Sequence, residues 1–160
     1  MRLGMPTREL VTAVQDADDA ARRRLAVWAV RDALDVAGTP DDELVGRLLA
    51  RFERGEPTSI APELASRNAG IERAKDAAYE EYLELDSSAG WVWRDRGLVP
   101  VTDEDRRRAE ETWRALLRQR WLADAVVYLA IEDTAIAALG ALYCASVHHQ
   151  RDKEEFLSRA

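Results

Sequence analysis

Two neighbouring acids, Glu132 and Asp133, stand in the most apolar stretch of the chain, residues 122–147. Asp124 is the only other charged residue in that stretch. If the stretch is a core helix, leaving a carboxylate buried without a partner costs several kcal/mol. We therefore expect at least one of the two acids to face an arginine, a metal ion or a polar cavity.

A second acidic group consists of Glu80, Glu81 and Glu84. Glu80 and Glu84 share one helix face because they are four residues apart. Facing Glu132 and Asp133 across a helical bundle, they would offer the oxygen ligands that Mg²⁺ prefers. As an ordinary structural feature, the same group is an acidic, solvated helix face.

The Glu-Glu-x-x-Glu pattern that begins at Glu80 resembles the half-motif of MazG-like all-α nucleotide pyrophosphatases. In that family, paired acidic helices hold magnesium on a triphosphate. The resemblance implies an alternative function, a Mg²⁺-dependent nucleotide pyrophosphohydrolase. Its metal ligands would be Glu80, Glu84, Glu132 and Asp133, with one carboxylate orienting the attacking water.

His148, His149 and Cys144 are the remaining side chains that ligate metals or act as nucleophiles. Neighbouring helical residues point about 100° apart, so the two histidines do not easily bind one metal ion. The sequence has no further histidine and one cysteine, which leaves a zinc site incomplete and excludes an internal disulfide. We interpret the histidines as helix-end residues and Cys144 as a buried, inert thiol.

The charge balance bears on the class of partner. The chain has 23 Lys and Arg against 30 Asp and Glu, a net charge of -7. Residues 59–71 have some features of a helix-turn-helix, but the segment 72–84 that would read DNA has five acids against two basic residues. Phosphates would repel it, so we expect no nucleic-acid partner. An acidic field suits a basic protein partner.

Length and hydropathy predict a single domain over residues 1–160 that is soluble and cytoplasmic. The first ten residues have no apolar run of the kind that a signal peptide needs. The apolar stretch 122–147 is long enough to span a bilayer, but Glu132 and Asp133 near its middle speak against membrane insertion.

The pattern of apolar residues predicts an all-α fold, a helical bundle of four to six helices around the central apolar helix. A long helix is expected over 7–36, with Gly38 after its end. Thr39 and Pro40 are expected to start the next helix. Gly70 is expected to break or kink a third helix over 62–85. Helical periodicity then continues from Asp103 nearly to the end, with a break expected at 120–124 or at Gly140.

A small β-hairpin insertion is expected at about 86–102. The runs 91–93 and 98–101 are rich in strand-forming residues, and they flank the turn-forming sequence Arg-Asp-Arg-Gly. Because an isolated hairpin is marginally stable in water, we expect Trp91 or Trp93 to pack on the helices.

The first two helices carry a further resemblance. The segments 21–34, 41–43 and 51–56 combine an arginine-rich alanine helix with an acidic-capped helix that ends in Gly-Glu. They are similar to the opening of an all-α immunity-protein family of bacterial polymorphic toxin systems. The resemblance implies stoichiometric, noncatalytic binding of a toxin domain, without a cofactor. Tryptophan is enriched among residues that dominate binding energy, so Trp91 and Trp93 are our candidate partner-binding residues. A helical homodimer also fits the many arginines and the long apolar segment.

Overall fold

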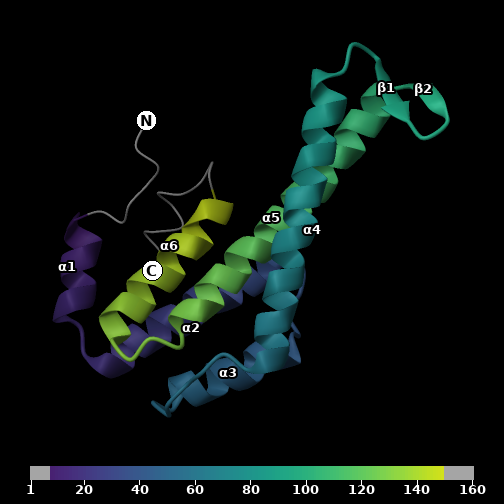
Figure 1. The fold of residues 1–160 in the computed structure, drawn as a ribbon. Helices are drawn as coiled ribbons and strands as arrows, with labels where there is room; N and C mark the ends of the chain where they lie inside the picture. Colours follow the sequence, from purple (N-terminus) through teal and green to yellow (C-terminus); the bar gives the residue numbers. More distant parts are fainter. Residues whose placement is uncertain (1–7, 150–160) are drawn as a thin grey trace. The chain divides into compact units, whose positions relative to one another are not determined.

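The computed structural model describes residues 8–149, apart from the side chain of His148. These residues form six helices and one two-stranded antiparallel sheet (Figure 1). The predicted all-α fold with a small hairpin is therefore confirmed. The elements in chain order are α1 (Arg8–Asp16), α2 (Asp19–Ala37), α3 (Glu43–Glu53), α4 (Pro62–Ser87), β1 (Trp91–Arg94), β2 (Gly97–Pro100), α5 (Asp103–Tyr128) and α6 (Thr134–His148).

The chain divides into two compact units. Unit 1 consists of residues 1–65 and 121–160, and unit 2 consists of residues 66–120. Each has a hydrophobic core of its own. The charge is also unequal: unit 1 has 18 acids against 12 basic residues, and unit 2 has 12 against 11.

The core of unit 1 is built around α2 and α6, which pack along each other, with α3 against α2 and α1 against α6. Small residues allow this close approach, because several alanines of both helices are fully buried. The largest side chains at the centre are Val30, Val45, Leu64, Val126, Leu129 and Leu142. Within residues 8–149, none of the helices has the length and apolar character needed to cross a membrane.

The long helix predicted over 7–36 is two helices. Asp18 ends the continuity because its carboxylate caps α2, accepting a hydrogen bond from the Ala21 backbone N–H at 2.7 Å. Arg22 secures the junction from the other side, since its Nε donates to the Val14 carbonyl at 2.9 Å. Asp18 and Arg22 thus each have a backbone partner at this junction.

Two further helix boundaries differ from expectation. The cap of α3 is Asp42, whose carboxylate accepts from the Val45 N–H at 3.1 Å, and not Thr39. Helix α4 continues through Gly70, where a break or kink was predicted. One interior glycine costs about 1 kcal/mol relative to alanine, and a 26-residue helix with good neighbours tolerates that.

The prediction of a central apolar helix over 122–147 is also wrong in its continuity. The helix is interrupted between Tyr128 and Thr134, and neither of the expected break points is used. Glu132 and Asp133 lie in this turn with exposed side chains. The expected burial of a carboxylate therefore does not arise, because the acids stand in the turn between α5 and α6 and not inside a helix.

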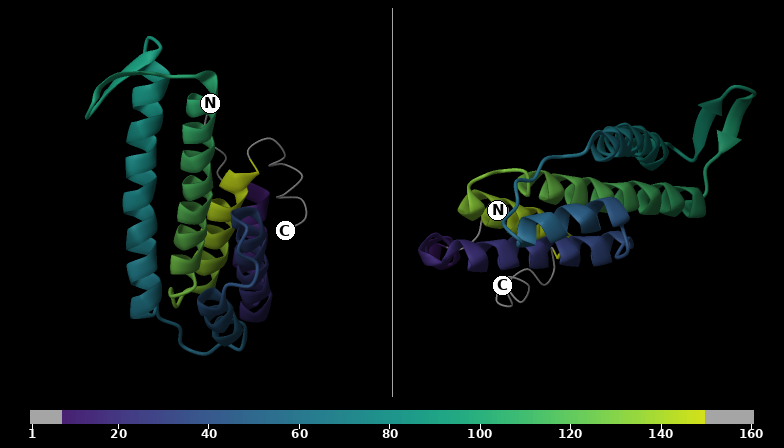
Figure 2. Two further views of the ribbon diagram at one scale, coloured as in Figure 1. Left: turned by 90° about the vertical axis from the view of Figure 1, so that its right-hand side faces the viewer. Right: turned by 90° about the horizontal axis from the view of Figure 1, so that it is seen from below.

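In unit 2, the segments of α4 and α5 run side by side (Figure 2). Their contact is largely aromatic: the Tyr82 and Trp113 rings stack with centroids 5.3 Å apart, and the Tyr79 ring lies 5.1 Å from that of Trp113. Glu72 of α4 accepts a hydrogen bond from Arg120 of α5. The buried core of this unit is small, and it lies at the hairpin end.

Candidate functional site: the outer face of the hairpin

The register of the hairpin decides which side chains face outward. Trp91 pairs with Pro100, Val92 with Val99, and Trp93 with Leu98. Successive side chains of a strand point to opposite faces, and directly paired residues share a face. Trp91, Trp93, Leu98 and Pro100 therefore lie on one face of the sheet, which we call the outer face.

The inner face rests on the helices through Val92. This side chain is 7% exposed and packs with Leu85 of α4 and Ala109 of α5. The prediction that Trp91 or Trp93 would pack on the helices is wrong, because Val92 takes that position. The neighbouring alternate positions must then point away from the core.

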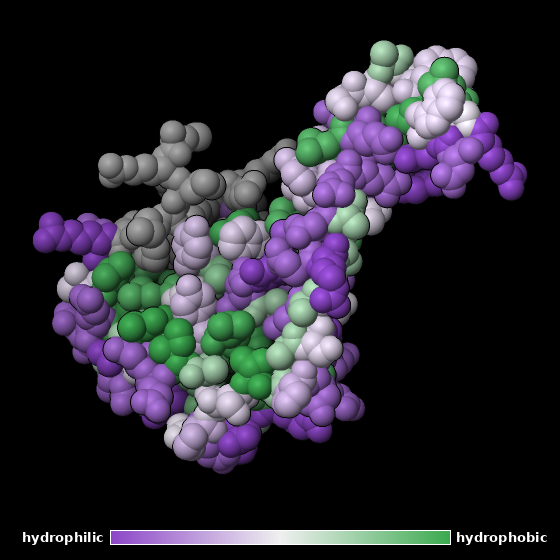
Figure 3. Space-filling view, viewed as in Figure 1, coloured by the Kyte–Doolittle hydropathy of each residue, from purple (hydrophilic) through white to green (hydrophobic). Residues whose placement is uncertain are grey.

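The outer face is open among the described residues. Trp91, Trp93 and Leu98 expose 57%, 72% and 61% of their surface. In the space-filling view, pale and green residues of the hairpin are bordered by purple, hydrophilic ones (Figure 3). Large apolar side chains that are exposed together mark interaction sites more often than single exposed ones do.

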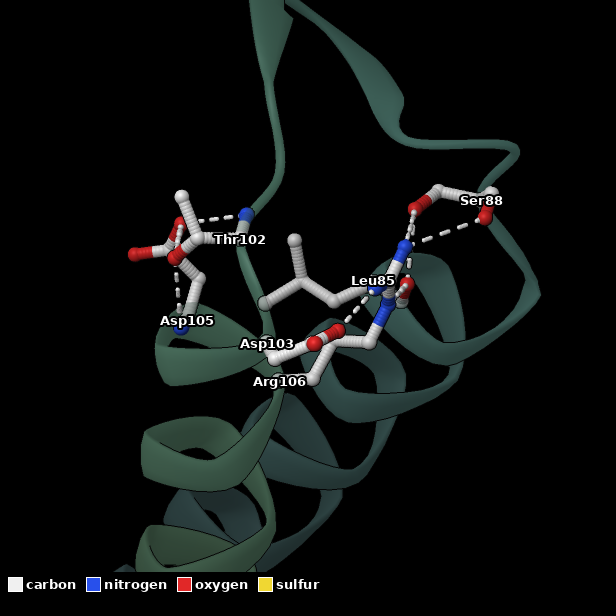
Figure 4. A network of polar contacts seen from close by, with 6 residues as sticks. All are labelled: Leu85, Ser88, Thr102, Asp103, Asp105 and Arg106. Carbon is white, nitrogen blue, oxygen red and sulfur yellow. Dashed lines mark hydrogen bonds and ion pairs between the residues drawn. The ribbon is translucent and has the colours of Figure 1, made fainter.

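The base of the hairpin is held by Arg106 at the start of α5 (Figure 4). Its Nε donates to the carbonyl of Leu85 at 3.0 Å, and one terminal nitrogen donates to the carbonyl of Ser88 at 3.3 Å. The other terminal nitrogen is paired with Asp103 at 2.9 Å. Arg106 thus satisfies carbonyls at the end of α4 and ties that end to α5.

The start of α5 is fixed by a capping box. The backbone N–H and the hydroxyl of Thr102 both donate to the Asp105 carboxylate, and the Asp105 N–H donates to the Thr102 hydroxyl (Figure 4). The hydrogen bonds from Thr102 hold the pKa of Asp105 below its ordinary value. The hairpin therefore leaves the helices at two anchored points.

The four acids of the alternative metal site are divided between the two units. Glu80 and Glu84 are exposed on α4, and Glu84 is ion-paired with Arg94 of β1 at 2.8 Å. Glu132 and Asp133 belong to unit 1. Within residues 8–149, no three His, Cys, Asp or Glu side chains gather in a group that could hold a metal ion.

Asp133 is the N-cap of α6. One carboxylate oxygen accepts hydrogen bonds from the backbone N–H groups of Ala135 at 2.9 Å and Ile136 at 3.1 Å. This places its negative charge at the positive end of the helix dipole. The partner of this acid is thus a helix end and not an arginine, a metal ion or a cavity.

Replacing Asp133 by alanine is expected to lower the free energy of unfolding by about 1 kcal/mol, because two N–H groups of α6 lose their acceptor. Urea unfolding followed by circular dichroism measures this change. Asp133→Asn keeps an acceptor oxygen and should retain most of the stability. Glu132→Ala, at an exposed neighbour with no ion-pair partner within residues 8–149, should stay within about 0.5 kcal/mol of the parent. Equal losses in Asp133→Ala and Glu132→Ala would contradict the capping role.

A hydrogen bond between the starts of α2 and α6 also shapes the local electrostatics. The Thr134 hydroxyl donates to the Asp19 carboxylate at 2.7 Å. This bond is the largest cause that holds the pKa of Asp19 below its ordinary value, and the charge of Arg22 contributes further. Because the pKa is lowered on folding, ionised Asp19 contributes stability above its unfolded pKa. That contribution is lost as pH falls through the folded pKa.

Thr134→Val is therefore expected to raise the pKa of Asp19 toward its ordinary value. An NMR titration of the Asp19 carboxyl group measures it. Thr134→Ser keeps the hydroxyl donor and should leave the pKa low. An unchanged pKa in Thr134→Val would show that Arg22 and Arg23 set it without the hydroxyl.

The remaining candidates from the sequence have structural settings where they are described. Cys144 is buried in the core of unit 1, as interpreted from the sequence. His149 Nε2 lies 2.7 Å from a carboxylate oxygen of Asp32 in α2. The side chain of His148 lies outside the described residues.

Sequence reasoning missed three residues that matter locally. Val92 sets the orientation of the hairpin, and a strand with apolar residues at three successive positions gives no local sign of which face turns inward. Arg106 anchors the end of α4, and its i, i+3 spacing to Asp103 is the signal that could have found it. Arg23, in the arginine run of α2, lines a cavity of unit 1.

No protein-family model matches this chain, and comparisons with curated proteins and with solved structures found no significant similarity.

Proposed function

We propose that the protein has a noncatalytic, protein-binding function and that the outer face of the hairpin binds a basic protein partner. The observation that carries the proposal is the exposure of Trp91, Trp93 and Leu98 together on one face of an anchored hairpin. Tryptophans of this kind supply a large apolar area at a small entropic cost. Their ring faces also attract the Lys and Arg side chains of a partner.

The charge around the hairpin favours a basic partner. Residues 80–108 form the end of α4, the hairpin and the start of α5. They contain eight acids against five arginines, a formal charge of −3, whereas the rest of unit 2 has four acids against six basic residues. The acidic surplus of unit 2 thus lies in the segments that carry and flank the exposed tryptophans, and it would speed the approach of a positively charged surface.

The class of partner is taken from the resemblance of segments 21–34, 41–43 and 51–56, in α2 and around α3, to an immunity-protein family. In that reading the partner is a toxin domain with a basic active-site surface, such as an enzyme that acts on nucleic acid must present. The tryptophans insert into this surface and the bound protein blocks access of substrate. The anchors at Arg106 and Thr102 support such a role, because a platform that is already ordered loses little entropy on binding.

Photocrosslinking in the producing cells tests the proposal. Trp93 is replaced by a photoreactive phenylalanine analogue, and adducts are identified by mass spectrometry. The matched control carries the analogue at Arg73, an exposed residue of α4 in the same unit and away from the hairpin. We expect a discrete adduct with one basic protein at position 93 and none at position 73.

The purified partner then decides the mechanism. A toxic activity that is abolished at one equivalent of this protein would support the immunity-type role. The same adducts at positions 73 and 93, or an adduct only with a second copy of this chain, would overturn the proposed partner.

A further inference from the structure

Unit 1 contains a cavity of about 330 Å³ that the proposed function does not use. It is lined by α2, by the end of α3 with the loop that follows, and by the turn between α5 and α6. Small-molecule sites occupy about 300–1,000 Å³, so this cavity falls at the small end of that range. Its walls combine Phe52, Pro57 and Ile131 with two charged side chains, Arg23 and Glu132, that have no ion-pair partner among the described residues.

Arg23 is the cation of this cavity. Its Nε is buried and has no hydrogen-bond acceptor within residues 8–149. The guanidinium lies over Gly55, where an added Cβ would come within 3.3 Å of Cζ and 3.5 Å of one terminal nitrogen. The guanidinium lines the cavity and has no carboxylate partner among the described residues, so its charge is available to a ligand that enters. The planar guanidinium is suited to a carboxylate.

Glu132 is the anion of the same cavity. It is exposed and is not paired with Arg23, although both line the cavity. The third charged side chain, Glu56, is already neutralised: Arg54 Nε lies 2.5 Å from one of its oxygens and Arg51 Nε lies 3.5 Å from the other. The charged side chains without an ion pair in the cavity are therefore one cation and one anion, and the charge of Arg23 also helps to lower the pKa of Asp19 at the start of α2.

The two hydroxyl groups in the cavity wall, those of Thr58 and Thr134, already donate hydrogen bonds within the protein. Thr58 donates its proton to the carbonyl of Leu129, and Thr134 donates to Asp19. Neither hydroxyl is left to donate to an anion. Arg23 is accordingly the donor for a bound carboxylate, and Glu132 is the acceptor for a bound ammonium.

We propose that the cavity binds a free aliphatic α-amino acid. The ligand's carboxylate would accept hydrogen bonds from Arg23, its ammonium would pair with Glu132, and its side chain would lie against Pro57 and Ile131. A zwitterion matches one free charge of each sign within one small cavity. A simple anion would leave Glu132 repelling it, and a simple cation would leave the Arg23 donor unsatisfied. This inference does not depend on the hairpin function.

Isothermal titration calorimetry of the full chain tests the proposal with L-leucine and with two analogues that each lack one of its charged groups. 3-Methylbutylamine lacks the carboxylate, and 4-methylpentanoate lacks the ammonium. We expect leucine, or another aliphatic amino acid in the same panel, to bind at millimolar concentration or below. Each of the two analogues should bind at least about tenfold more weakly than leucine, since each loses a charge-assisted contact.

Variants assign the two contacts. Arg23→Gln should weaken the binding of leucine at least about tenfold and leave the binding of 3-methylbutylamine unchanged. Glu132→Gln should also weaken the binding of leucine at least about tenfold, and it should leave the binding of 4-methylpentanoate unchanged. Arg24→Gln is the matched control, because Arg24 is the exposed neighbour on α2 and does not line the cavity. If Arg23→Gln does not fold, Arg23→Lys replaces it as the test variant, because it keeps the positive charge. The variant Trp93→Ala should leave leucine binding unchanged.

Three results would overturn the inference. One is the absence of binding by every aliphatic amino acid at millimolar concentration. Another is equal binding of leucine and 4-methylpentanoate, which would reduce the cavity to an anion site. The third is an equal loss in Arg23→Gln and Arg24→Gln.

Discussion

Replacing Gly140 by alanine is expected to lower the free energy of unfolding by about 3 kcal/mol, the upper part of the range for overpacked cores. Gly140 lies inside α6, where alanine would otherwise be favoured over glycine by about 1 kcal/mol. The opposite sign is expected because the ring of Tyr128, at the end of α5, lies directly on the Gly140 backbone. A Cβ at this position would overlap Cγ, Cδ1 and Cε1 of the ring, so the whole side chain has to move.

A double-mutant cycle isolates this contact. Tyr128→Phe keeps the ring and should not relieve the loss caused by Gly140→Ala. Tyr128→Ala removes the ring, and in that background Gly140→Ala should become neutral or stabilising. Gly46→Ala is a matched control in α3, because a Cβ there has nothing within 4 Å. A neutral or stabilising Gly140→Ala in the parent chain would refute the proposed overlap.

The role of Gly140 is an example of what could not be predicted from the sequence. Gly140 was a candidate for a helix break because glycine is a poor helix former. Its role is instead to admit the aromatic ring of a residue twelve positions earlier, which no local pattern encodes. The actual break, at Leu129 to Asp133, contains neither glycine nor proline. Its fixed points are the Asp133 cap and a hydrogen bond from Thr58 to the Leu129 carbonyl, a contact between residues 71 positions apart.

Sequence patterns predicted those features that depend on contacts between residues close together in the chain. The hairpin was predictable because strand-forming runs flank a turn sequence, and the Thr102–Asp105 capping box was predictable from its spacing. The orientation of the hairpin was not predictable, because Val92 competes with two larger tryptophans for the inner face. The core between α4 and α5 has room for the smaller side chain, and this choice exposes the tryptophans.

The double variant Trp91→Ala/Trp93→Ala is expected to lose partner binding while it keeps its fold. Removing one dominant interface residue costs about 2 kcal/mol or more, so binding should weaken by at least about 30-fold. The free energy of unfolding should change by less than about 1 kcal/mol, because both side chains are exposed and lose only cross-strand contacts. Titration calorimetry with the partner captured by crosslinking measures the first quantity, and urea unfolding measures the second.

Val92→Ala, one position away from each tryptophan, should give the opposite result. It removes a buried side chain from the small core of unit 2 and should cost about 2 kcal/mol of stability. The outer face of the molecules that remain folded keeps both tryptophans and should still bind. Alternate residues of one four-residue strand would then separate folding from binding. If the double tryptophan variant binds as tightly as the parent, the outer face is not the interface, and the partner must bind elsewhere on the molecule.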